Sequence, residues 1–176
     1  HANSWRRFTS QSYAPVSPTW GVNNRSVALR IPAGSKKARR IEHRPSGVDA
    51  NPYLVAATVL AALRHGLKNK IDPGTETTGN GYENSANADK IPRDWRSAIA
   101  AAKGSEFLKS ALGADLHRTF VAIKESEYLR VARTIADWGI ADGYFATVAD
   151  GESFYRELAW LCLHQHGSFN SPVWFN

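Results

Sequence analysis

Residues 23–44 read Asn23-Asn-Arg-Ser-Val-Ala-Leu-Arg-Ile-Pro-Ala-Gly-Ser-Lys-Lys-Ala-Arg-Arg-Ile-Glu-His-Arg44. Two stretches of β-strand character, at about 25–31 and 38–44, flank the turn sequence Pro32-Ala-Gly-Ser35. This arrangement predicts a short antiparallel pair of strands. The remaining chain predicts mainly helices, so we expect an α+β fold in which helices wrap a small β element.

The second of these strands predicts a charged site. Because side chains alternate between the faces of a strand, Arg40, Glu42 and Arg44 are expected on one face. Residues expected on the other face are Arg39, Ile41 and His43. A carboxylate between two guanidinium groups stays ionised and suits Mg²⁺ or Mn²⁺, while arginine binds phosphate or carboxylate oxygens two at a time. A solvated strand face, on which glutamate and arginine merely pair, is the open alternative.

The basic charge of the chain is concentrated in its N-terminal quarter. Residues 1–44 hold nine Lys and Arg against one acidic residue, whereas the remainder holds thirteen against fifteen. This asymmetry predicts an anionic ligand. No helix-turn-helix, zinc-finger or RNA-binding signature accompanies it, so a small phosphorylated ligand is favoured and nucleic acid is not expected.

The composition bounds the class of protein. With 176 residues, of which 43% are hydrophobic, the chain can bury one ordinary core. No stretch approaches the ~20 apolar residues of a membrane span, so no membrane partner is expected. The single cysteine, Cys162, allows no internal disulfide and favours a cytoplasmic location. The chain contains no methionine and stops at Trp-Phe-Asn, which we interpret as a piece of a longer protein.

Helix and loop signals follow the charged strand. Asn51-Pro52 predicts the start of a helix that runs to about Leu67, and its nearly all-round apolar surface predicts burial. Residues 10–19 and 72–89, rich in Pro, Gly, Asn, Thr and Ser, predict loops. Further helices are expected near 92–103, 105–112, 115–137 and 150–166.

The stretch from Asn3 to about Tyr128 resembles the C-terminal part of the catalytic domain of the glutamine synthetase family. The phrases that carry the resemblance are Asn3-Ser-Trp-Arg-Arg7, Tyr13-Ala-Pro-Val16, Trp20-Gly-Val-Asn-Asn-Arg-Ser26, Arg30-Ile-Pro32, Arg39-Arg-Ile-Glu-His-Arg44 and Asp49-Ala-Asn-Pro-Tyr-Leu54. We assign residues 1–134 to this partial domain. The resemblance implies a homo-oligomeric ligase that uses ATP and Mg²⁺ or Mn²⁺ to join glutamate to ammonia or an amine through γ-glutamyl phosphate.

The resemblance also implies roles for individual residues. Glu42 matches a metal-binding glutamate, and Arg7 and Arg44 match arginines that hold glutamate. The nucleotide phosphates would be held by Arg25, Arg30 and Arg40, with Lys37 as a weaker candidate. Arg25 is also the candidate catalytic residue. Arg25 and Arg30 are five residues apart, so both can reach ATP only if the strand bends or bulges.

The nitrogen donor is left open by one departure from the family pattern. Ammonia-using members carry a glutamate just before Ala-Pro, where it helps to deprotonate ammonium, but this chain has Tyr13. The phrases Trp20-Gly and Glu42-His-Arg44 are also closer to the γ-glutamyl-polyamine and γ-glutamyl-amine ligases. A primary amine therefore competes with ammonia as the donor, unless Tyr13 is an ordinary loop aromatic.

Residues 131–176 resemble a different enzyme, the N-terminal part of the cobalamin-dependent ribonucleotide reductases. The most specific phrase is Asn170-Ser-Pro-Val-Trp-Phe-Asn176. We assign 135–176 to this segment and expect a mainly helical tail in which Cys162, His164 and His166 are structural. The competing functions are a reductase fragment using adenosylcobalamin and an inactive chimera. Neither enzyme is complete, so we expect the isolated chain to be inactive.

Overall fold

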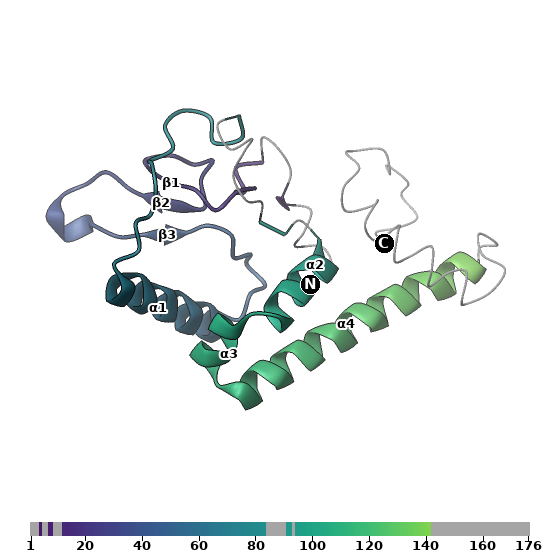
Figure 1. The fold of residues 1–176 in the computed structure, drawn as a ribbon. Helices are drawn as coiled ribbons and strands as arrows, with labels where there is room; N and C mark the ends of the chain where they lie inside the picture. The colour runs from purple at the N-terminus through teal and green to yellow at the C-terminus, as the bar shows by residue number, and fades with distance from the viewer. Residues whose placement is uncertain (1–3, 5–6, 9–11, 84–90, 93, 142–176) are drawn as a thin grey trace. The chain divides into compact units, whose positions relative to one another are not determined.

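The computed structural model describes residues 4, 7–8, 12–83, 91–92 and 94–141 (Figure 1). In chain order they form β1, β2, the 3₁₀ turn η2, β3 and the helices α1 to α4. The chain divides into two compact units, His1–Ser126 and Glu127–Asn176. The helix expected at 150–166 lies outside the described residues, and the domain boundary expected at residue 134 stays a prediction.

The described part of the first unit contains a small three-stranded sheet in the order β1-β2-β3. β2 (Leu29–Ile31) pairs antiparallel with β3 (Glu42–His43), and this register places Arg30 opposite Glu42. The predicted antiparallel pair is therefore confirmed. β1 (Trp20–Val22), which sequence patterns did not reveal, pairs parallel with β2.

The strands are shorter than expected, and the expected strand start at residue 25 is wrong. Residues 23–28 form a succession of bends, and the backbone amides of Ala28 and Leu29 both donate to the carbonyl of Thr19, each at 3.0 Å. This bend turns the chain back so that β2 can run parallel to β1. Val27 within it is fully buried, together with Pro15 from the preceding segment.

The segment 72–82, here called the strap, lies along β1. The amide of Thr77 donates to the carbonyl of Trp20 at 2.9 Å, and the Glu76 carboxylate accepts from the amide of Val22 at 2.8 Å. The Trp20 indole donates to the carbonyl of Gly74 at 3.0 Å. The strap is irregular, as expected of a loop, but it satisfies the backbone groups of an edge strand. Figure 1 shows it leaving α1 and passing the strands.

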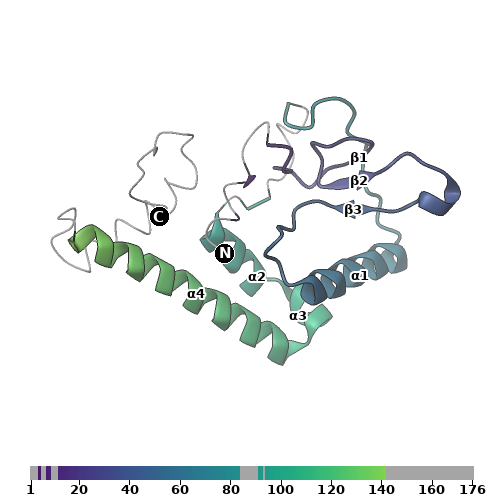
Figure 2. The ribbon, with the colours of Figure 1, turned by 180° about the vertical axis from the view of Figure 1, so that it is seen from behind.

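α1 (Pro52–Asn69) begins as predicted and ends two residues later than expected. The Asn51 side chain accepts from the amides of Tyr53 and Leu54, and Lys70 ends the helix in a left-handed conformation. The expectation that α1 is buried is wrong, since none of its residues is buried and Tyr53 is 84% exposed. Among the described elements its main neighbour is the short helix α3, which lies beside it in Figures 1 and 2. One short helix cannot cover a surface that is apolar on every side.

The three helices predicted between residues 92 and 137 are present with shifted ends. They are α2 (Trp95–Lys103), α3 (Glu106–Leu112) and α4 (Ala114–Ala141). Asp94 and Ser105 cap α2 and α3 by accepting backbone amide protons. In the first unit, Lys103 of α2 pairs with Glu125 of α4 at 2.8 Å. None of the described helices is long and apolar enough to cross a membrane.

We expect Gly21→Ala to destabilise the first unit. A Cβ at Gly21 would lie 2.7 Å from the carbonyl oxygen of Thr77 in the strap, so β1 or the strap must shift. The free energy of unfolding should fall by about 1–3 kcal/mol, measured by urea unfolding followed by circular dichroism.

Gly66→Ala is the matched control for this substitution. A Cβ at Gly66 in α1 meets nothing within 4 Å, so alanine should stabilise the helix by about 0.5–1 kcal/mol. A Gly21→Ala protein as stable as the parent would contradict the close approach of the strap to β1.

Candidate functional site

The candidate site is centred on Glu42, which lies between two arginines. Arg30 Nη1 donates to Glu42 Oε2 at 2.8 Å, and Arg40 Nη2 donates to Oε1 at 3.0 Å. The β2–β3 register produces the first pair, while residue alternation along the chain produces the second. The Glu42 side chain is 28% exposed and that of Arg40 is 57% exposed, so solvent reaches this cluster.

The electrostatics of the cluster favour an ionised carboxylate. The hydrogen bond from Arg30 lowers the pKa of Glu42, and the bond from Arg40 lowers it further, against an opposing effect of burial. Buried Arg30 Nε has no hydrogen-bond partner among the described residues. A buried N–H without an acceptor is costly, so this donor is suited to a bound anion.

The Arg44 guanidinium binds backbone carbonyls. Its Nη2 donates to the carbonyls of Tyr13 at 2.6 Å and Arg25 at 2.8 Å, and no ion pair joins it to Glu42 among the described residues. The expected convergence of charges is confirmed for Arg40 and Glu42, while the placement of Arg44 on the same face stays a prediction. Backbone bonding between the two strands continues to Arg44, whose amide donates to the carbonyl of Ala28 at 2.9 Å. The buried Nε of Arg44 also has no partner within the described part of the chain.

Arg7 lies against the same segment. Its guanidinium donates to the carbonyls of Pro45 and Arg44, each at 3.3 Å. The two arginines that the resemblance assigns to glutamate thus meet where the chain leaves β3. Here both of them bind backbone carbonyls.

Tyr13 has an unusual backbone conformation beside Arg44. Its φ is 58°, in the left-handed region that residues other than glycine rarely adopt, and its side chain is 63% exposed. The neighbouring Ser12 hydroxyl donates to the carbonyl of Arg7 at 2.5 Å and accepts from the amide of Ala14 at 3.3 Å. Strained residues of this kind persist where surrounding contacts hold them, and they gather at functional sites.

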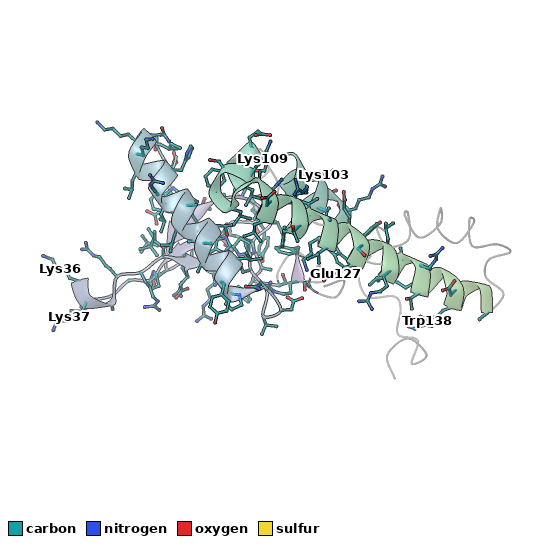
Figure 3. All side chains as sticks on the ribbon, turned by 90° about the horizontal axis from the view of Figure 1, so that it is seen from below. Lys36, Lys37, Lys103, Lys109, Glu127 and Trp138 are labelled. Atoms are coloured by element: carbon teal, nitrogen blue, oxygen red, sulfur yellow. The ribbon has the colours of Figure 1, made fainter. Side chains whose placement is uncertain are left out.

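The remaining candidates are spread over the β element. Arg25 lies in the bend of residues 23–28, exposed and off the strand, so it is not restricted to a strand face relative to Arg30. Lys37 belongs to η2 (Lys36–Ala38) and is exposed. Figure 3 shows Lys36 and Lys37 projecting from the connection between β2 and β3. No bond joins Lys37 to Glu42 in the described structure.

The described residues contain no group of three His, Cys, Asp or Glu side chains placed to hold a metal ion. Glu42 can therefore offer one carboxylate to a divalent cation, and its oxygens already accept from two arginines. A carboxylate has about four lone-pair positions, so these bonds leave room for a cation ligand.

Two polar side chains near the site were missed by sequence reasoning. Asn24 donates to the carbonyls of Thr77 and Gly79 at 2.9 Å, and its Oδ1 accepts from Ser26. Tyr82 Oη donates to the carbonyl of Ala14 at 2.9 Å. The Asn-Asn pair before Arg25 is a turn signal, but nothing local indicates a partner more than 50 residues away.

Comparison with known proteins covers most of this chain. The family model described as glutamine synthetase, catalytic domain, matches residues 1–142. The γ-glutamylputrescine synthetase of Escherichia coli K12 is 38% identical over 139 residues, which are 78% of this chain and 29% of that enzyme. The chain thus spans less than a third of this relative's length. A solved structure titled GmaS/ADP complex matches with a TM-score of 0.64 at 29% identity, covering 77% of this chain and 31% of that one.

A second similarity concerns a shorter segment. The vitamin B12-dependent ribonucleotide reductase of Rhodopirellula baltica is 77% identical over 47 residues, which are 27% of this chain and 4% of the reductase. Together the two matched shares exceed the whole chain, so the two alignments overlap. Both resemblances seen in the sequence motifs are confirmed, as expected of a chimera.

We expect Glu42→Gln to change how stability depends on pH. The pKa of Glu42 is lowered from the usual 4.5. The ionised carboxylate therefore stabilises the fold at pH values above its pKa in the unfolded chain, and this stabilisation is lost as the pH falls through its pKa in the folded chain. The Glu42→Gln variant should be less stable than the parent at pH 7, and the difference should narrow below pH 4.5. Urea unfolding at several pH values measures it.

Glu106→Gln serves as the matched control. Glu106 is 84% exposed and lies 3.5 Å from Lys109, so its loss should give a smaller difference at every pH. Equal pH profiles for the two variants would contradict the pairing of Glu42 with Arg30 and Arg40.

We expect Arg44→Ala to lower the free energy of unfolding by about 1–2 kcal/mol, because two carbonyls lose a charged donor. Arg39→Ala, at an exposed arginine with no bond among the described residues, should change it by less than about 0.5 kcal/mol. Thermal unfolding of both variants checks this. If the Arg44→Ala variant is as stable as the Arg39→Ala variant, the bonds of Arg44 do not stabilise the fold.

Proposed function

Because the chain belongs to the glutamine synthetase family through its catalytic-domain segment, we propose that residues 1–134 are part of a glutamate–ammonia or glutamate–amine ligase. In this reaction the γ-carboxylate of glutamate attacks the terminal phosphorus of ATP, and ADP leaves. The nitrogen donor then attacks the resulting acyl phosphate, loses a proton and releases inorganic phosphate. The products are a γ-glutamyl amide, ADP and phosphate.

The observation that carries this proposal is the Arg30–Glu42–Arg40 cluster. It combines an ionised carboxylate with two guanidinium groups, and one buried guanidinium N–H has no acceptor among the described residues. Phosphoryl transfer is accelerated by positioned cations that neutralise charge on the transferred group. Arg30 and Arg40 would bind the phosphates of ATP, with Arg25 and Lys37 from the neighbouring bend and turn. Arg25, which is exposed, is the candidate catalytic residue that would bind the transferred phosphoryl group.

Glu42 would supply one oxygen ligand to Mg²⁺ or Mn²⁺. The donor set fits a hard cation, because the group is an ionised carboxylate with free lone pairs. Further ligands would have to come from outside the described residues. The cation, when bound, supplies charge neutralisation at the phosphates.

Within the described chain, α1 has too few packing partners to bury its apolar surface, and the charged cluster lacks a full set of metal ligands. α1 has apolar residues on all sides but no buried residue. The described residues do not gather three possible metal ligands around Glu42. The Escherichia coli relative is more than three times as long as the aligned part of this chain. We therefore propose that sequence equivalent to the rest of that relative would pack against α1 and supply the other metal ligands.

Arg7 and Arg44 would bind glutamate. Arg44 retains an Nε–H without an acceptor among the described residues, although its Nη2 is committed to two carbonyls. This geometry leaves the Nε–H of Arg44 available to a substrate carboxylate. We therefore infer a double role, in which Arg44 both binds glutamate and orders the loop of Tyr13.

The reductase segment does not carry a function of its own in this proposal. It corresponds to 4% of the reductase, so neither ribonucleotide reduction nor adenosylcobalamin binding is proposed. We retain the division into 1–134 and 135–176, and propose a cytoplasmic ligase from the single cysteine. The 176-residue chain by itself should form no γ-glutamyl product, because its described residues do not gather three metal ligands around Glu42.

The proposed function can be tested by grafting. Residues 1–134 replace the matching segment of the Escherichia coli γ-glutamylputrescine synthetase, and ADP and γ-glutamyl product are measured with glutamate, ATP and putrescine or ammonia. We expect turnover by the graft, and a fall of about 100-fold or more with a raised metal requirement for Glu42→Gln. Arg39→Ala is the control that should retain turnover. A folded graft without product would refute the ligase function.

The same graft tests the nitrogen donor. If Tyr13 replaces an ammonium-handling carboxylate, putrescine or a monoamine should be used in preference to ammonia. Tyr13→Glu should shift the ratio of kcat/KM towards ammonia by about tenfold, since a carboxylate stabilises ammonium and accepts its proton. Efficient use of ammonia by the parent graft, with amines ignored, would exclude the amine ligase while leaving the ligase function intact.

A further inference from the structure

Tyr82 of the strap contacts the loop of Tyr13. Tyr82 Oη donates to the carbonyl of Ala14 at 2.9 Å, joining residues 68 positions apart. Tyr82 is half-buried, and Ala14 is the first buried residue after the exposed Tyr13. The hydroxyl therefore binds where the chain passes from the buried core to the exposed loop.

Two successive carbonyls of this loop are held by side chains from separate elements. Arg44 Nη2 binds the carbonyl of Tyr13 at 2.6 Å, and Tyr82 binds that of Ala14. The left-handed φ of Tyr13 is unfavourable for a residue with a Cβ, so it needs support from surrounding contacts. Arg44 and Tyr82 together provide such contacts.

The strap is itself well anchored at the end that carries Tyr82. Asn24 donates to the carbonyls of Thr77 and Gly79, and the amide of Gly81 donates to Ser26 Oγ at 2.8 Å. A Cβ at Gly81 would lie 2.8 Å from that same oxygen, so the strap approaches the 23–28 bend closely. Tyr82 thus extends from a segment that is tied to the β element immediately before it.

We propose that Tyr82 is a positioning residue for the nitrogen donor. By fixing the carbonyl of Ala14, it holds Tyr13 in the orientation in which its side chain meets a primary amine. Tyr82 does not touch the amine in this proposal, and it has no part in binding ATP. The inference rests on the proposed ligase function and extends it to a residue that none of the motif phrases includes.

The first arm of the test needs no activity. Hydrogen exchange of the 176-residue chain is compared for Tyr82→Phe and for Tyr53→Phe, which removes an exposed hydroxyl from α1. Loss of one hydrogen bond should raise exchange of the amides in residues 12–19 by about two- to tenfold for Tyr82→Phe only. Unchanged exchange in this segment, or an equal rise in both variants, would overturn the proposal.

The second arm uses the graft that tests the ligase function. Tyr82→Phe should raise KM for the amine by about two- to tenfold over Tyr53→Phe, while KM for ATP stays unchanged. Equal changes in both KM values would mean a merely structural role and would overturn the proposal. If the folded graft forms no product with any donor, the ligase proposal fails, and the exchange arm alone decides whether Tyr82 holds the loop.

Discussion

The described part of the first unit depends on the bonds that one guanidinium group makes to backbone carbonyls. Arg44 connects the residues after β3 to the Tyr13 loop and to the bend at Arg25. These three segments share no continuous secondary structure, and the strands between them have only two or three residues each. Ladders this short provide few backbone bonds, so a charged donor with fixed planar geometry becomes a major part of the framework.

This arrangement couples the candidate site to the fold. Arg30, Glu42 and Arg40 form a charged cluster on β2 and β3, and Arg44 lies two residues beyond Glu42 with a structural commitment of its own. Under the proposed ligase function, Arg44 would order the loop of Tyr13 and offer an N–H to glutamate, which would bring the two substrates close together. Such proximity suits a reaction in which the amine must attack an acyl phosphate formed at the neighbouring position.

Much of the local structure could be predicted from the sequence alone. The start of α1 followed from Asn51-Pro52, because a cap and a helix-starting proline act within a few residues. The antiparallel β2–β3 pair followed from a turn signal, and the Arg40–Glu42 pair followed from alternation over two positions. Six ordered phrases also carried the family assignment, since they preserve side-chain chemistry at fixed spacing.

Tertiary structure alone decided the long-range contacts. β1 pairs parallel with β2 across the bend that contains buried Val27. The strap covers β1 through hydrogen bonds between residues more than 50 positions apart in the chain. The partners of Arg44 and Tyr82 are backbone carbonyls, which every residue possesses, so no sequence pattern identifies them. Helix caps and strand alternation depend on neighbours along the chain, whereas these contacts depend on where the folded chain places a carbonyl oxygen.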